Sequence, residues 1–334
     1  MVSMGGSSVI YASDQHGSLL RSVLPVPCTL VRNSRELTTA AAVRGSVCFV
    51  DIDLLGKVDH RALKAPTVAV MDRSPADALA GTVRVLDAYP WLSHVVQLPL
   101  LTTPKAAEHL QVILDRLTTG RQQFMLGPNG VGRVALLNQA SHRGARFKRI
   151  HEFFESHGVS ERILTTIHDV SEELVMNALY NAPAEAGYFD RPRSRAEDVA
   201  LPADRACEIS YGIEGPTAYI RVRDTFGALQ RPRLMQVLNR ISGMSEVKLD
   251  ESRGGAGLGM WRIFSAAMAV TVTVIPGALT DIIVAVDVKA GRRSVRPAAV
   301  HLFFGRQSHR WSGVPVLDDD LGLIEQSFTH MRSA

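Results

Sequence analysis

One segment of the chain, residues 169–181, places polar side chains at a regular spacing within an otherwise apolar pattern. Glu173, Asn177 and Asn181 recur at every fourth residue, so a helix would carry all three on one face. Burying a carboxylate and two carboxamides without partners is costly. Asparagine oxygen suits a hard cation, and a glutamate can accept a proton from a nucleophile. The pattern therefore points to a Mg²⁺-nucleotide site, with Asn177 on the metal and Glu173 as the candidate base.

Two later segments add residues suited to a nucleotide. Residues 218–224 alternate in polarity and end in Asp224, which predicts a strand with a carboxylate at its end. Residues 253–260 read Arg-Gly-Gly-Ala-Gly-Leu-Gly-Met and precede an apolar helix predicted for residues 261–269. Backbone N–H groups of a glycine-rich turn before a helix can bind phosphate. Each segment alone is a weak signal, but the three in this order are specific.

In order and spacing, these segments resemble the boxes of the GHKL ATPase family, which includes histidine-kinase ATP-binding domains, anti-sigma-factor serine kinases, gyrase and Hsp90. The resemblance covers roughly residues 130–290 and implies ATP and Mg²⁺ as ligands. It implies that Glu173 is catalytic, that Asn177 holds Mg²⁺ and that Asp224 accepts from the adenine amino group. The first glycine box departs from the family's Asp-x-Gly-x-Gly, because Asp224 is followed here by Thr-Phe-Gly-Ala. The nucleotide-binding residues that the resemblance implies are Asn177, Asn181, Asp224, Gly227, Gly254, Gly255, Gly257, Leu258, Gly259 and Thr280.

The resemblance leaves the activity open. One hypothesis is an ATP-binding regulator that phosphorylates Ser or Thr of a signalling partner, since phosphoryl transfer needs mainly positioning, a metal and a base. The alternative is a non-catalytic switch or scaffold, in which nucleotide binding orders a lid segment and a partner protein recognises the ordered form. A self-phosphorylating histidine kinase fits less well, because no dimerisation helix with an acceptor histidine box precedes Glu173. Both leading hypotheses imply ATP or ADP and a protein partner, and both are compatible with a homodimer.

The composition is that of a globular protein with a mild positive charge. The 334 residues are 46% apolar and 21% charged, and the net charge is +4. The basic residues are scattered, so we expect no nucleic-acid partner. Cys28, Cys48 and Cys207 have no metal or redox spacing and fit a reducing compartment. Without a signal-peptide pattern or an apolar run of membrane-spanning length, the sequence predicts a cytoplasmic protein with no membrane contact.

The first part of the chain alternates short apolar runs with helical spacing, which implies a parallel sheet covered on both faces. The predicted strands are residues 9–12, 46–51, 66–71 and 94–98, and the predicted helices are residues 79–88 and 105–117. In order and size this segment loosely resembles a response-regulator receiver, a flavodoxin-like domain. An unrelated small α/β domain is the alternative.

The chemistry of a receiver is only partly present in this segment. Asp14 alone stands where receivers cluster acidic residues for Mg²⁺, and Leu98-Pro99 replaces their Lys-Pro. Asp51 or Asp53, after the predicted strand, could take the place of the phosphate acceptor. We therefore expect a degenerate receiver, with phosphorylation at Asp51 or Asp53 as the less favoured hypothesis.

These observations predict an α/β protein in four parts. Residues 7–118 form the receiver-like domain, 119–129 a linker, 130–290 a GHKL-type sandwich of a mixed sheet with helices on one face, and 291–334 an extension of unknown structure. Pro183 should end the helix that carries Glu173, because proline cannot continue it. Residues 231–252 stand where the family has its lid.

Overall fold

The computed structural model describes residues 7–74, 76–103, 106–120, 126, 129–242, 258–289, 294, 296–305 and 325–328. It confirms the α/β class. The chain divides into two compact units, each considered by itself below. The first comprises Met1–Gln123 with Pro297–His301, and the second Phe124–Arg296 with Leu302–Ala334. Among the described helices, none is long and apolar enough to span a membrane.

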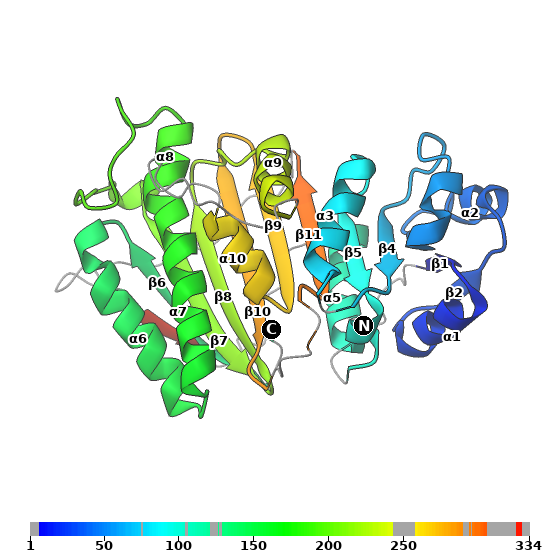
Figure 1. Cartoon of the computed structure of the whole chain (residues 1–334), viewed down its shortest axis with the longest axis horizontal. Helices are drawn as coiled ribbons and strands as arrows, with labels where there is room; N and C mark the ends of the chain where they lie inside the picture. Colours follow the sequence, from blue (N-terminus) through cyan, green and yellow to red (C-terminus); the bar gives the residue numbers. More distant parts are fainter. Residues whose placement is uncertain are drawn as a thin grey trace. The chain divides into compact units, whose positions relative to one another are not determined.

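The first unit is built on parallel strands in the order β2-β1-β3-β4-β5, with β11 antiparallel to β5. All residues of β1, β3, β4 and β5 are buried, as expected for strands covered on both faces. The elements, which Figure 1 labels, are β1 (Ser8–Tyr11), α1 (Asp14–Val23), β2 (Cys28–Leu30), α2 (Ser34–Ala40), β3 (Val47–Asp51), η1 (Ile52–Lys57), β4 (Thr67–Met71), α3 (Ala78–Ala88), β5 (His94–Gln97), α4 (Leu98–Leu101), α5 (Ala106–Thr119) and β11 (Ala299–Phe304).

The predicted strands and helices of this unit are confirmed, with small shifts at their ends. Residues 291–334, whose structure the sequence left unassigned, contribute β11, which pairs Ala299, Val300 and His301 with residues of β5. Sequence alone could not find this pairing, because the partner strand lies about two hundred residues away and short apolar runs are ambiguous.

Asp51 ends β3, where a receiver would place its phosphate acceptor. Its side chain is largely buried and already has two partners. The Ser13 backbone N–H donates to Oδ2 at 2.7 Å, and His16 Nδ1 lies 2.8 Å from Oδ1. Phosphorylation of Asp51 would have to break its contacts with Ser13 and His16. Asp53, by contrast, is exposed on η1. Phosphorylation at either residue stays a prediction.

Three imidazoles from different elements meet inside the first unit. His109 of α5 places Nε2 at 3.1 Å from Nε2 of His301 on β11, and the His94 ring of β5 lies 5.6 Å from that of His301. The His301 side chain is fully buried, and its Nδ1 has no hydrogen-bond partner within the described residues. Burial lowers the pKa of His109 to about 4 and lowers that of His301 well below its ordinary value. His109 and His301 are therefore neutral at pH 7.

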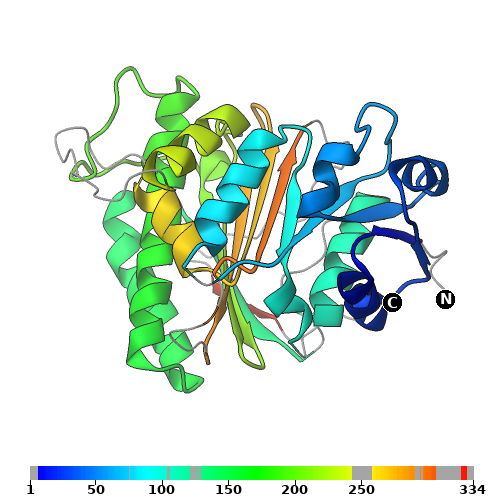
Figure 2. The same cartoon turned by 45° about the vertical axis from the view of Figure 1, so that its right-hand side comes forward.

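The second unit has one sheet with the strand order β12-β6-β7-β8-β10-β9. All pairs between these strands are antiparallel, whereas the sequence analysis expected a mixed sheet here. Helices α6, α7 and α10 lie on one face of the sheet (Figures 1 and 2). The elements are β6 (Val131–Leu137), η2 (Ala140–His142), α6 (Arg143–Ser156), α7 (Glu161–Met176), η3 (Asn177–Asn181), α8 (Ala182–Glu185), η4 (Ala203–Arg205), β7 (Cys207–Glu214), β8 (Thr217–Asp224), α9 (Arg231–Ser242), α10 (Leu258–Ala266), β9 (Ala269–Ile275), β10 (Leu279–Asp287) and β12 (Glu325–Phe328).

The opposite faces of β8 and β10 have different roles. One row of side chains forms a buried ion-pair network, in which Arg221 donates Nε and Nη2 to the two oxygens of Asp281 at 2.8 and 2.6 Å. Arg223 links Asp281 to Glu208 at 3.2 and 3.3 Å. Because side chains alternate along a strand, the next residues of β8 and β10 face the helices. The register set between these strands pairs Asp224 with Thr280 on that helix-covered face.

Candidate functional site

Pro183 does not end the helix that carries the predicted site, so that prediction was wrong. The helix passes from α7 through a π turn, η3, into α8 and ends at Glu185. The Ala182 backbone N–H donates to the Asn177 carbonyl, five residues back. Pro183 has no N–H to donate to the carbonyl four residues before it and would clash there in a regular α-helix. The wider turn accommodates the proline, and such turns are frequent at functional sites.

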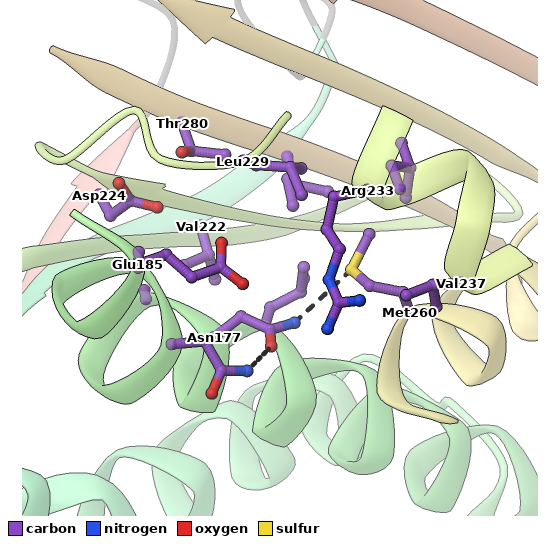
Figure 3. Close-up of a pocket in the computed structure, with 15 residues that line it drawn as sticks. Asn177, Glu185, Val222, Asp224, Leu229, Arg233, Val237, Met260 and Thr280 are labelled. Atoms are coloured by element: carbon purple, nitrogen blue, oxygen red, sulfur yellow. Dashed lines mark hydrogen bonds between the residues drawn. The ribbon is translucent and has the colours of Figure 1, made fainter. Parts of the chain in front are cut away.

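A cavity of about 680 Å³, counted with its open mouth, lies between this helix, the sheet and α9 (Figure 3). Four of the residues predicted to bind nucleotide line it, namely Asn177, Asn181, Asp224 and Thr280. The other lining residues are Leu174, Ala178, Ala182, Glu185, Val222, Leu229, Arg233, Leu234, Val237, Met260 and Ile282. The cavity thus combines apolar walls with a few polar groups.

Asp224 is the buried carboxylate of this cavity and is 6% exposed. Backbone N–H groups of Phe226 and Gly227 donate to its Oδ1 at 2.9 and 3.2 Å, so the side chain has a fixed orientation. Burial raises the pKa of Asp224 to about 6, and these two N–H groups only partly offset that effect. At pH 7 the group is a carboxylate that can accept a hydrogen bond from a ligand.

Thr280 lies opposite Asp224 in the β8–β10 register and is 4% exposed. The side chain and the backbone of Thr280 act on Asp224 as hydrogen-bond donors, which lowers the pKa of that carboxyl and offsets part of the effect of burial. Because Thr280 and Asp224 both line the cavity, a ligand with polar groups could contact both.

Asn177 and Asn181 form a linked pair on the helical wall. Asn181 Nδ2 donates to Asn177 Oδ1 at 2.6 Å, and Asn177 Nδ2 lies 3.6 Å from the Met260 sulfur. Asn177 Oδ1 keeps a second lone pair for a cation. Across the described residues, no cluster of three or more His, Cys, Asp or Glu side chains could hold a metal ion. The residues therefore fit Mg²⁺ only as an ion that shares Asn177 with ligand oxygens, which is its usual mode with nucleotides.

Glu173 is placed beside the cavity and does not line it. Its carboxylate forms an ion pair with Arg195 at 3.3 Å and lies 3.9 Å from Arg262 of α10. A side chain at Gly259 would overlap Glu173 Oε2, so the carboxylate lies directly against the first turn of α10. The residue is 8% exposed. Two guanidinium groups therefore hold the Glu173 carboxylate. Their positive charge disfavours proton uptake by this carboxylate, so Arg195 would have to move before Glu173 could act as a base.

The predicted glycines have different positions. Gly227 has φ +56°, and a side chain there would overlap the backbone of the β9–β10 turn at Ile275. It fixes the loop after Asp224 and does not line the cavity. Gly259 contacts Glu173, as described. The other predicted positions of this box, Gly254, Gly255 and Gly257 together with the Leu258 side chain, lie outside the described residues.

Sequence reasoning missed two charged residues of the cavity, Glu185 and Arg233. Glu185 continues the four-residue spacing of Asn177 and Asn181. The predicted end of the helix at Pro183 excluded Glu185 from this pattern. No sequence motif marks Arg233, because its position at the cavity depends on how α9 packs against the rest of the unit.

The chain matches no protein-family model, and a search among curated proteins found no match either.

Proposed function

We propose that the second unit binds Mg²⁺-ATP as a GHKL-type domain and that the chain is an ATP-binding signal-transduction regulator with slow or partner-dependent phosphoryl transfer. The first unit, with its strand order β2-β1-β3-β4-β5, would be a flavodoxin-like, degenerate receiver. A protein partner, a homodimer and a cytoplasmic location belong to the same proposal.

The observation that carries the proposal is the buried Asp224–Thr280 pair within an apolar cavity. A flat heterocycle with an exocyclic amine can fill apolar space, donate to Asp224 and reach the Thr280 hydroxyl. Adenine has this chemistry. Asn177, on the neighbouring wall, then has a suitable oxygen for a Mg²⁺ ion bound to the phosphates.

Removing the carboxamide of Asn177 is expected to weaken Mg²⁺-dependent binding of ATP by roughly tenfold, since losing a group that supports a metal costs about 10–100-fold in affinity. Isothermal titration of ATP with Mg²⁺ and with EDTA would compare the parent with Asn177→Ala. Binding in EDTA should stay close to that of the parent. Glu172→Ala, at an exposed position of the same helix, is the control. An unchanged Mg²⁺ dependence in Asn177→Ala would exclude this helix as the metal site.

The affinity for adenosine is expected to fall as the pH drops below 6. The ionised Asp224 is the much stronger acceptor for the adenine amine, and its pKa is raised to about 6 in the ligand-free protein. Each pH unit below that value should lower the affinity by up to about tenfold. Adenosine is the ligand of choice because it has no phosphate groups that titrate in this range. In Asp224→Asn the affinity should not depend on pH between about 5 and 7.5. A parent whose affinity is equally independent of pH would show that adenine does not contact Asp224.

A non-catalytic switch is the second candidate, and the ion pairs of Glu173 with Arg195 and Arg262 support it. A carboxylate held in this way stabilises the helix packing without needing to take a proton. Incubation with γ-labelled ATP and Mg²⁺, with and without candidate partners, separates the two hypotheses. Acid-stable phosphate on Ser or Thr supports the kinase, and nucleotide binding without transfer supports the switch.

A further inference from the structure

Two oppositely charged side chains border the cavity from different helices. Glu185 ends α8, and Arg233 lies in the first turn of α9. Both line the cavity, and Figure 3 shows both charged groups directed into it. Glu185 therefore offers a hydrogen-bond acceptor, and Arg233 a set of donors, to the part of a ligand that lies at the border of the apolar cavity.

The two charges are close enough to influence each other but do not meet. Burial raises the pKa of Glu185, and the positive charge of Arg233 opposes that effect. No ion pair joins these two residues, both of which the structure describes. Among the described residues, Arg233 donates to Gln236 Oε1 at 3.1 Å. A guanidinium has five N–H donors, so most remain for a ligand.

The order of polar groups along the wall indicates which part of a ligand each would contact. The π turn aligns Glu185 with Asn177 and Asn181, and Figure 3 shows Glu185 between Asp224 and Asn177. With a base at Asp224 and phosphates at Asn177, the sugar lies between them, beside Glu185. An ionised carboxylate only accepts hydrogen bonds, and a ribose hydroxyl donates one. Arg233, on the opposite helix, has the charge and geometry for phosphate oxygens.

We propose that Glu185 accepts a hydrogen bond from a ribose hydroxyl and that Arg233 contacts the phosphates, so that the cavity selects adenine ribonucleotides over deoxyribonucleotides. This inference rests on the proposed function and adds the residues that set sugar specificity.

The test compares equilibrium affinities for ATP, 2′-deoxy-ATP, 3′-deoxy-ATP and adenosine in the parent and in single variants. The parent should bind ATP about tenfold or more tightly than at least one deoxy analogue, because a hydrogen bond to a charged group is worth roughly a tenfold to hundredfold change. In Glu185→Ala this preference should disappear, and Glu185→Gln, which keeps one acceptor oxygen, should lie between. Arg233→Ala should weaken ATP binding by about tenfold and leave adenosine binding unchanged.

Matched controls are Glu172→Ala on α7 and Arg240→Ala on α9, both at exposed positions outside the cavity lining. Circular dichroism and thermal midpoints check the fold of each variant. A parent that binds ATP without sugar preference, or a Glu185→Ala variant that keeps it, overturns this inference alone. An Arg233→Ala variant that weakens adenosine as much as ATP also overturns it. A parent that binds no adenine nucleotide overturns the proposed function as well.

Discussion

Glu173→Gln is expected to lower ATP turnover or phosphoryl transfer by about 10²–10⁴-fold while leaving ATP affinity nearly unchanged. A general base acts on the chemical step and contributes typically about that factor. Glutamine keeps the size of the side chain, which matters because Glu173 lies against Gly259. Phosphate release and labelled transfer, measured beside ATP affinity in parent and variant, check the prediction.

Arg195→Ala supplies the companion measurement, because it removes the ion pair that holds Glu173 and leaves the carboxylate in place. If Glu173 is a restrained base, this variant should turn over ATP faster than the parent. Glu172→Gln, an exposed change one residue away, is the matched control. A parent that binds ATP tightly but shows no turnover, alone or with any partner, would mean that the enzyme hypothesis must be dropped in favour of the switch.

Acidification is expected to remove about 3 kcal/mol of the free energy of unfolding of the first unit. His109 has a pKa of about 4 in the folded protein, whereas a histidine in an unfolded chain titrates near 6.5. Between these values the unfolded state binds more protons, so stability is present above about pH 6.5 and is lost as the pH falls toward 4. Burial of the neighbouring His301 acts in the same direction.

Urea unfolding of the full chain between pH 7.5 and 4 measures this loss, and hydrogen exchange in β5 and α5 assigns it to the first unit. His109→Gln should reduce the pH dependence, because glutamine keeps a polar group but takes up no proton. His60→Gln, at an exposed position of the same unit, should leave it as in the parent. Equal pH dependence in the parent and His109→Gln would show that carboxylates alone cause the loss.

The sequence by itself determined many of the local elements and singled out four residues of the cavity wall. Strands such as β3, β4 and β5 were predictable because their apolar runs are short and bounded by turn residues. Asn177, Asn181, Asp224 and Thr280 line one cavity, and their binding of a nucleotide stays a prediction. A four-residue period and a carboxylate at a strand end depend only on neighbours in the chain.

Only the tertiary structure decided how these groups are partnered. The π turn carries the helix through Pro183 to Glu185, a position that local propensity excludes. Glu173 lies outside the cavity lining and is paired with Arg195, which is 22 residues away in sequence. His301 meets His109 through β11, which lies in the region whose structure the sequence left unassigned. In each case the arrangement is stabilised by contacts between segments distant in sequence, namely ion pairs, buried hydrogen bonds and strand pairing. Such contacts leave no periodic pattern in the sequence, so sequence patterns cannot predict them.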